Sequence, residues 1–135
     1  MDQVEINRPF VVVVDDDESV RESLPDLLRH FGCDAEVFPS AEAFLVSDAV
    51  AKTRCLILDI GLPALNGPDL HQELLRQGHR IPTVFITAQG DRSLEPRLVA
   101  LGAVACLFKP FSDTALLGAL TAALGGRDDV VGSKR

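Results

Sequence analysis

Five charged or polar residues stand where short apolar runs of this sequence end, and together they could bind phosphate and a metal ion. They are Asp15, Asp16, Asp59, Thr87 and Lys109. Carboxylates brought within a few ångströms of one another repel and raise their own pKa values unless a cation lies among them. Mg²⁺ suits carboxylate ligands and neutralises charge on a phosphoryl group. Asp59 could then act as a carboxylate nucleophile, with the lysine and the threonine binding phosphoryl oxygens.

The elements that must position these residues are five apolar runs, each followed by a segment with helical spacing of its apolar residues. The strands are expected at 10–14, 33–38, 55–58, 83–86 and 104–108. The helices are expected at 18–30, 40–45, 68–78, up to about Leu101, and at 112–124. Five strand–helix units in sequence predict an α/β fold, a doubly wound parallel sheet with helices on both faces. Its site should lie beyond the carboxyl ends of the strands.

Several local signals support these boundaries or complicate them. Ser40 and Ser112 are suited to cap helices, and Pro68 fits the first position of a helix. Pro25 lies inside the first helix and should bend or locally break its hydrogen-bond ladder. Pro96 biases the residue before it away from helical angles, so the fourth helix should begin late or be irregular.

Length and composition fit one globular domain. The chain has 135 residues, of which 47% are hydrophobic and 24% charged, with a net charge of -7. The acidic balance argues against direct nucleic-acid binding, which relies on clustered lysine and arginine. No apolar run approaches the roughly 18 residues that a membrane span needs, and the start lacks a signal core, so a cytoplasmic protein is expected. The domain should cover 1–126, with a flexible tail at 127–135.

The cysteines and histidines show no metal-ligand spacing. Cys33, Cys55 and Cys106 are odd in number and far apart, which indicates buried hydrophobic residues rather than a zinc site or disulfide. The three histidines fall on expected helix surfaces or ends and are predicted to be exposed or capping residues. They are His30, His71 and His79.

Four fragments give the chain a resemblance to the receiver domains of two-component response regulators. They are VDDDESVR at 14–21, LDIGLPALNG at 58–67, FITA at 85–88 and FKPF at 108–111. Each is weak alone, but all four stand in order at expected strand ends, and the match spans about 11–124. The resemblance implies a flavodoxin-like (βα)5 fold with strand order 2-1-3-4-5.

The resemblance also implies roles for individual residues. Asp59 would be the phosphoacceptor, and Asp16, Asp59 and the Gly61 carbonyl would bind Mg²⁺ directly, with Asp15 assisting through water. Thr87 and the Ala88 amide would hold phosphoryl oxygens, and Lys109 would pair with them. The bond between Lys109 and Pro110 would be cis.

The same resemblance implies partners and a switch. A sensor histidine kinase or histidine phosphotransfer protein would supply the phosphoryl group. Phosphorylation would repack the face of the fourth helix, fifth strand and fifth helix, for a downstream protein partner or a phosphorylation-dependent dimer. Cys106 stands where the family commonly has an aromatic switch residue, which puts that switch in doubt. Phe108 lies on the same face by strand alternation and could substitute for it.

Two other function classes stay open at this point. A magnesium-dependent phosphatase with an aspartyl nucleophile would need a second acid two residues after it, where this chain has Gly61, and a substrate-capping insertion, which is absent. An interaction module without phosphorylation would usually lack one of the acids or the lysine, and all are present. The expected protein is therefore a stand-alone phosphorylatable receiver, not a turnover enzyme.

Overall fold

The computed structural model describes residues 8–88 and 95–125 as alternating strands and helices. The elements are β1 (Phe10–Val14), α1 (Glu18–His30), β2 (Asp34–Phe38), α2 (Ala41–Leu45), η2 (Val50–Lys52), β3 (Cys55–Asp59), α3 (Gly67–Arg76), β4 (Thr83–Thr87), α4 (Glu95–Ala100), β5 (Ala105–Phe108) and α5 (Asp113–Ala123). Every predicted strand and helix is therefore confirmed, with bounds shifted by at most a few residues. The domain boundary at 126 and the tail lie outside the described residues and stay predictions.

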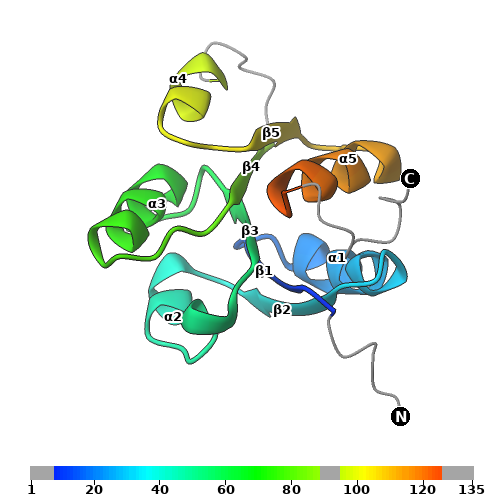
Figure 1. Ribbon diagram of the computed structural model, residues 1–135, viewed down its shortest axis with the longest axis horizontal. Helices are drawn as coiled ribbons and strands as arrows, with labels where there is room; N and C mark the ends of the chain where they lie inside the picture. Colours follow the sequence, from blue (N-terminus) through cyan, green and yellow to red (C-terminus); the bar gives the residue numbers. More distant parts are fainter. Residues whose placement is uncertain (1–7, 89–94, 126–135) are drawn as a thin grey trace.

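The five strands form one parallel sheet in the order β2-β1-β3-β4-β5, as the resemblance implied. Figure 1 shows the sheet edge-on, with α1 and α5 on one face and α2, α3 and α4 on the other. β1 and β3 are central, and all five residues of β3 are buried. Strands buried on both faces read as continuous apolar runs, which is why CLILD shows no polar alternation until its last residue.

Each face of the sheet carries its own hydrophobic core. The core under α1 and α5 contains Leu24, Leu28, Ile57, Leu116 and Leu120, among others. The core under α2, α3 and α4 contains Phe44, Leu58, Leu70, Phe85 and Leu98, among others. Alternate residues of one strand enter opposite cores, so the backbone of each strand is fixed from both sides and its last residue has a defined direction. Within the described ranges, no helix is long and apolar enough to cross a membrane.

The helix starts follow the capping signals. The hydroxyls of Ser40 and Ser112 accept hydrogen bonds from the backbone N–H groups of residues 43 and 115, as predicted. Asn66 caps α3, which puts Pro68 one position later than predicted. α1 continues through Pro25 as a single helix. α4 begins at Glu95, directly before Pro96, and is short, in keeping with the expectation of a late or irregular start.

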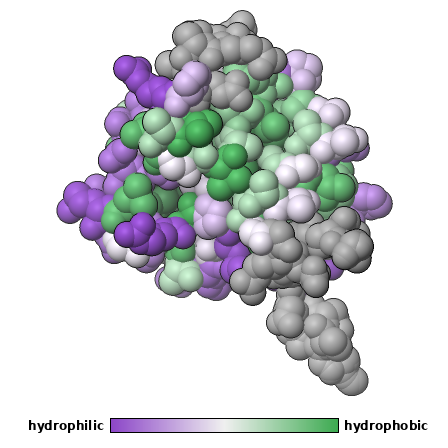
Figure 2. Space-filling view, turned by 45° about the horizontal axis from the view of Figure 1, so that its top comes forward, coloured by the Kyte–Doolittle hydropathy of each residue, from purple (hydrophilic) through white to green (hydrophobic). Residues whose placement is uncertain are grey.

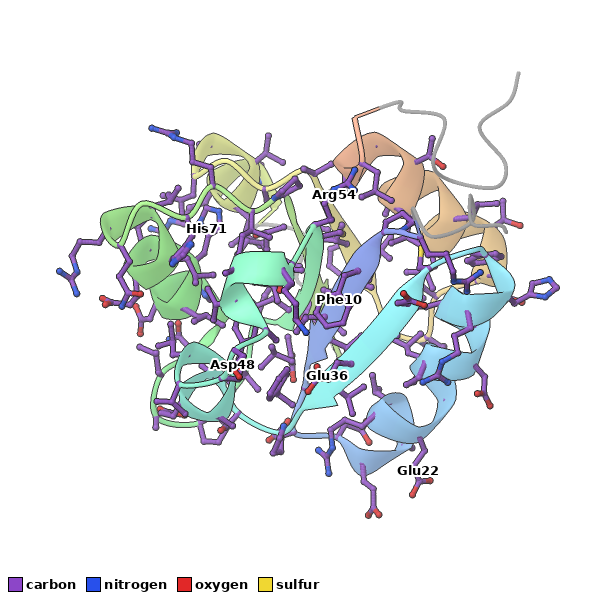
Figure 3. The ribbon with its side chains drawn as sticks, turned by 60° about the horizontal axis from the view of Figure 1, so that its bottom comes forward. Phe10, Glu22, Glu36, Asp48, Arg54 and His71 are labelled. Atoms are coloured by element: carbon purple, nitrogen blue, oxygen red, sulfur yellow. The ribbon has the colours of Figure 1, made fainter. Side chains whose placement is uncertain are left out.

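His71 corrects the prediction that the histidines are exposed or capping residues. Its side chain is only 5% exposed and meets the ring of Phe85 edge-on, with 5.8 Å between ring centroids. Figure 3 shows it at the inner side of α3. The sequence made Leu75 part of the apolar stripe, but Leu75 is 38% exposed. The rotation of α3 against the sheet, which helical spacing alone does not set, decides which of the two is buried.

The burial of His71 predicts a loss of stability in mild acid. Burial lowers the pKa of His71, and its Nδ1 has no hydrogen-bond partner among the described residues. Below the ordinary histidine pKa of about 6.5, the unfolded chain therefore binds a proton that the folded one resists, so the free energy of unfolding falls as pH falls. His71→Gln should remove this slope in urea unfolding between pH 7 and 5. His30→Gln, at an exposed position, should keep it.

The loop after β3 contains a strained backbone position. Ala64 has φ of 59°, in the left-handed region that side chains with a Cβ disfavour. That conformation costs an L-residue roughly 1–2 kcal/mol relative to glycine. The loop is tied to α2 by Glu42, whose carboxylate accepts a hydrogen bond from the Leu65 N–H at 3.1 Å. The strained backbone at Ala64 thus lies next to a residue that a contact with α2 holds in place.

Ala64→Gly is therefore expected to stabilise the fold by about 0.5–1 kcal/mol, although glycine usually destabilises. The reverse exchange serves as a control, because Gly118 lies in α5 with nothing within 4 Å of an added Cβ. Gly118→Ala should stabilise by a similar amount through helix propensity. Urea unfolding measures both. A loss of stability in Ala64→Gly would contradict the left-handed assignment.

Candidate functional site

The carboxyl ends of the strands bring the predicted site residues to one edge of the sheet. Val14 pairs with Leu58 and Asp59 with Ile86, so the ends of β1, β3 and β4 lie side by side. β5 continues the row, since Thr87 pairs with Phe108, the residue before Lys109. The parallel register therefore assembles residues that lie far apart in the sequence.

Three carboxylates converge at this edge. Asp15, Asp16 and Asp59 each offer an oxygen within 4.8 Å of the others. Asp15 is fully buried, Asp59 is 7% exposed and Asp16 is exposed. Their donor set is all hard oxygen, which suits Mg²⁺ rather than a soft metal. The carboxylates could thus hold a divalent cation with one open side toward solvent.

Lys109 balances part of this negative charge. Its Nζ lies 2.9 Å from Asp15 Oδ2, with 16% of the lysine side chain exposed. Burial lowers the pKa of Lys109, but the contact with Asp15 and the negative charges of Asp15, Asp59 and Asp17 raise it. These raising effects together outweigh burial, so the pKa of Lys109 is raised overall. Apart from that ion pair, Asp15 Oδ2 has no hydrogen-bond partner among the described residues. The Lys109–Pro110 bond is cis, as the resemblance implied.

Asp59 is the carboxylate whose environment is most changed. Burial and the neighbouring Asp15 raise its pKa to about 6, against the opposing effects of the Gly61 N–H and of Lys109. The Gly61 N–H donates to Asp59 Oδ1 at 3.1 Å. The start of α3 packs on the same residue, because a Cβ on Gly67 would lie 2.5 Å from the Asp59 carbonyl oxygen. The side chain of Asp59 therefore has a fixed direction, and its carboxyl group loses its proton near pH 6.

The remaining predicted residues lie around this cluster. Thr87 ends β4 half-buried, and its carbonyl accepts the Lys109 N–H at 2.8 Å. Ala88 is exposed. Asp17 is not part of the cluster: it caps α1, accepting from the Ser19 N–H at 3.0 Å and the Ser19 hydroxyl at 2.7 Å, which lowers its pKa. No described hydrogen bond joins the Thr87 hydroxyl to the acids, so its role rests on its place at the strand end.

β5 follows the strand alternation on which the prediction for Phe108 rests. Cys106 packs against the core under α3 and α4, whereas Ala105 and Leu107 pack against the opposite core. Alternation therefore puts Phe108 on the side of Cys106. Cys33 and Cys55 are buried as expected, and burial raises the pKa of the Cys55 thiol to about 12.

An open groove of about 860 Å³ adjoins the cluster, between α1 and the segment that joins β5 to α5. Its apolar lining comes from both sides, and Asp17, Ala88 and Lys109 also line it, of which Lys109 pairs with Asp15 of the cluster. The apolar lining residues are Val20, Leu24, Leu27, Pro110 and Phe111. A partner lying in this groove would reach the acidic cluster.

Sequence reasoning missed one residue at the site. Arg21, in the first turns of α1, donates from its guanidinium to the backbone carbonyl of Asp15 at 3.0 Å. The signal that could have found it is spacing, because Arg21 lies one helical turn after the cap residue Asp17 and so returns toward the end of β1.

Comparisons with known proteins agree with this geometry. The family model described as "Response regulator receiver domain" matches residues 11–121. "Nodulation protein W" from Bradyrhizobium diazoefficiens is 44% identical over 116 residues, which cover 86% of this chain and 51% of that protein. "Response regulator protein TodT" from Pseudomonas putida is 39% identical over 114 residues, which cover 84% of this chain and 50% of that protein. The chain thus spans about half the length of these relatives.

A solved structure supports the same assignment. The response regulator receiver protein from Burkholderia phymatum has a TM-score of 0.76 and 38% identity, covering 87% of this chain and 96% of that one. The similarity therefore extends over most of both chains. The sequence matches, the strand order and the acidic edge of the sheet agree, and this chain therefore belongs to the receiver domain family of two-component response regulators.

Proposed function

We propose that this domain accepts a phosphoryl group on the carboxylate of Asp59, from a phosphohistidine donor and with Mg²⁺. The observation that carries the proposal is the convergence of three carboxylates within 4.8 Å, with Lys109 2.9 Å from Asp15. Such a cluster is costly to fold unless a cation or a ligand uses it. A switch of this kind is not a turnover enzyme, and its output is a protein contact.

Asp16, Asp59 and the carbonyl of Gly61 would hold the metal, with Asp15 assisting through water. When bound, Mg²⁺ neutralises charge on the incoming phosphoryl oxygens. The hard-oxygen donor set and the free capacity of Asp15 Oδ2 beyond its ion pair fit this ion. The residues therefore match the group that the family implies.

The chemical step would be an in-line transfer between two nucleophiles. A carboxylate oxygen of Asp59 attacks the phosphorus, the new O–P bond forms, and the P–N bond of the donor breaks with its electron pair returning to the imidazole ring. Lys109 would then pair with a phosphoryl oxygen, and Thr87 and the Ala88 amide would hold the others. Because this chemistry needs mainly positioning and charge stabilisation, no separate general base is required.

The donor would lie in the groove between α1 and the start of α5. This groove is the described cavity next to the acids, and it offers an apolar floor flanked by Asp17, Asp26 and Asp113. We infer a partner with an apolar helical face and basic residues at its rim, which fits a histidine kinase or a histidine phosphotransfer protein.

The downstream contact would use a second face, built from α4, β5 and α5. Figure 2 is turned toward this side and shows hydrophobic residues gathered there. Val99 on α4 and Val104 before β5 are 52% and 36% exposed. With Cys106 at the usual aromatic position, a change there would have to be reported by Phe108 or by α4 itself. A dimer or an attached output domain are both compatible with this face.

Incubation with a small phosphodonor tests the proposal. Wild-type protein with phosphoramidate and Mg²⁺ should gain the mass of one phosphoryl group, and peptide mapping should place it on Asp59. Chelation of the metal should prevent the gain. No mass change with the small donor and with a panel of phosphorylated histidine kinases would overturn the proposed function.

A further inference from the structure

We infer that Arg21 is a positioning residue for the metal site: it fixes the peptide between Asp15 and Asp16 so that the exposed Asp16 carboxylate points at the cluster. The inference rests on the proposed function, since it concerns the same acidic edge. The main observation behind it is the hydrogen bond that the Arg21 guanidinium donates to the Asp15 carbonyl at 3.0 Å.

Asp15 and Asp16 reach the cluster by different means. The Asp15 side chain is buried and doubly held, by the Asp17 N–H at 2.9 Å on Oδ1 and by Lys109 at 2.9 Å on Oδ2. Asp16 is exposed, and no side-chain hydrogen bond or ion pair of the described residues reaches its carboxylate. Its approach to within 4.8 Å of the other two acids must therefore come from its backbone.

The backbone of Asp16 is held on both sides. A peptide unit is planar, so the direction of the Asp15 carbonyl sets the direction of the bond that leads into Asp16. Before Asp16, the Arg21 guanidinium donates a hydrogen bond to the Asp15 carbonyl. After Asp16, the Asp17 N–H donates to Asp15 Oδ1. Arg21 is in turn fixed by α1, where its own N–H donates to the Asp17 carbonyl at 3.2 Å. The first turn of α1 thus transmits its position to Asp16.

The arginine charge acts in the opposite direction on metal binding. The Arg21 guanidinium, bound to the Asp15 carbonyl, is a cation near the acidic edge and competes with Mg²⁺ for its negative potential. On electrostatic grounds alone, its removal would tighten metal binding. Loss of positioning would weaken the metal, because Asp16 would have to be ordered at the moment of binding. The sign of the change in affinity therefore separates the two effects.

The test is metal affinity in Arg21→Met and Arg21→Lys. Methionine keeps an unbranched side chain without a hydrogen-bond donor. Lysine keeps the positive charge and can still donate, but without the planar fork of the guanidinium. We expect Arg21→Met to weaken Mn²⁺ and Mg²⁺ binding about three- to tenfold, the range of one lost hydrogen bond, and Arg21→Lys to recover part of the loss. The chain has no Trp and no Tyr, so calorimetry and the paramagnetic resonance signal of free Mn²⁺ replace intrinsic fluorescence.

Arg29→Met provides the matched control, because Arg29 lies on the same helix with an exposed side chain paired to Asp26. It should leave metal affinity unchanged. Circular dichroism and urea unfolding of all variants check the fold. Unchanged or tighter metal binding in Arg21→Met would overturn the inference while leaving the proposed function intact, provided that wild type binds metal and gains phosphate. Wild type that binds no metal and gains no phosphate would instead overturn the proposed function.

Discussion

Replacing Asp59 by asparagine is expected to abolish phosphoryl acceptance while making the fold more stable. The amide lacks the nucleophilic carboxylate oxygen pair that the transfer needs. The substitution also removes a buried negative charge beside Asp15, and the cost of that charge is seen in the pKa of Asp59, which is raised to about 6. At neutral pH without metal, the gain in the free energy of unfolding should be about 1–2 kcal/mol. A tenfold change in proton affinity corresponds to about 1.4 kcal/mol, and the burial of an amide offsets part of the gain.

The pH dependence gives this prediction its sign. The unfolded chain loses the proton of Asp59 near pH 4, but the folded chain keeps it until about pH 6. Over that interval the folded state binds more protons, so the Asp59 contribution lowers wild-type stability as pH rises. The advantage of Asp59→Asn should therefore be full above pH 6 and disappear toward pH 4.

Urea unfolding in the presence of a chelator measures the gain in stability. Intact mass after incubation with phosphoramidate measures the loss of phosphoryl acceptance. Asp48→Asn is the control, because Asp48 is exposed, lies between α2 and η2 (Figure 3) and is not one of the three clustered acids. It should keep phosphorylation and change stability little. Because a misfolded variant could not be more stable, a stable Asp59→Asn that gains no phosphate assigns the loss to chemistry. Phosphate gain in this variant, or a loss of stability, would contradict the site as described.

Replacing Lys109 by methionine is expected to destabilise the metal-free protein by about 2–4 kcal/mol. Asp15 is fully buried, and the Lys109 ammonium is its ion-pair partner at 2.9 Å. Removing one member of a buried pair leaves the other charge uncompensated, which costs more than the net value of the pair. Methionine retains most of the stem, so the loss reports the charge rather than a cavity.

Magnesium should restore part of this loss. The cation would take over the negative potential that the lysine no longer balances, so Mg²⁺ should raise the unfolding midpoint of Lys109→Met more than that of wild type. Lys52→Met is the control: Lys52 is exposed and lies 5.0 Å from the Phe10 ring centroid, a contact of about 0.5–1 kcal/mol. Equal midpoints for wild type and Lys109→Met without metal would show that the pair does not stabilise Asp15.

The fold and most of the site could be read from the sequence because they depend on strand ends. An unbroken apolar run such as 55–58 has one stable place, the middle of a parallel sheet, and the acid that follows it must then lie at the carboxyl edge. The caps at Ser40 and Ser112 follow from side chains that reach their own backbone. Such short-range rules do not depend on how the helices rotate.

What the sequence left undetermined depends on that rotation and on backbone detail. His71 and Leu75 both lie on possible inward positions of α3, and only packing against Phe85 decides for His71. The Arg21 contact needs the direction of the Asp15 carbonyl, which no residue pattern encodes. The left-handed angle of Ala64 was equally hidden, since the usual signal for that conformation is glycine. The expected stand-alone state, the tail and the cytoplasmic location stay predictions.

The contact between Gly67 and the backbone of Asp59 limits which side chains position 67 can carry. Gly67 has no functional group, yet any side chain there would meet the Asp59 carbonyl oxygen at 2.5 Å, and that backbone atom cannot move aside without shifting β3. In a library randomised at this position, selection for phosphate acceptance should therefore recover glycine as strictly as selection at an acidic position recovers aspartate. A residue without a functional group would thus be constrained by sterics as strictly as one that takes part in the chemistry.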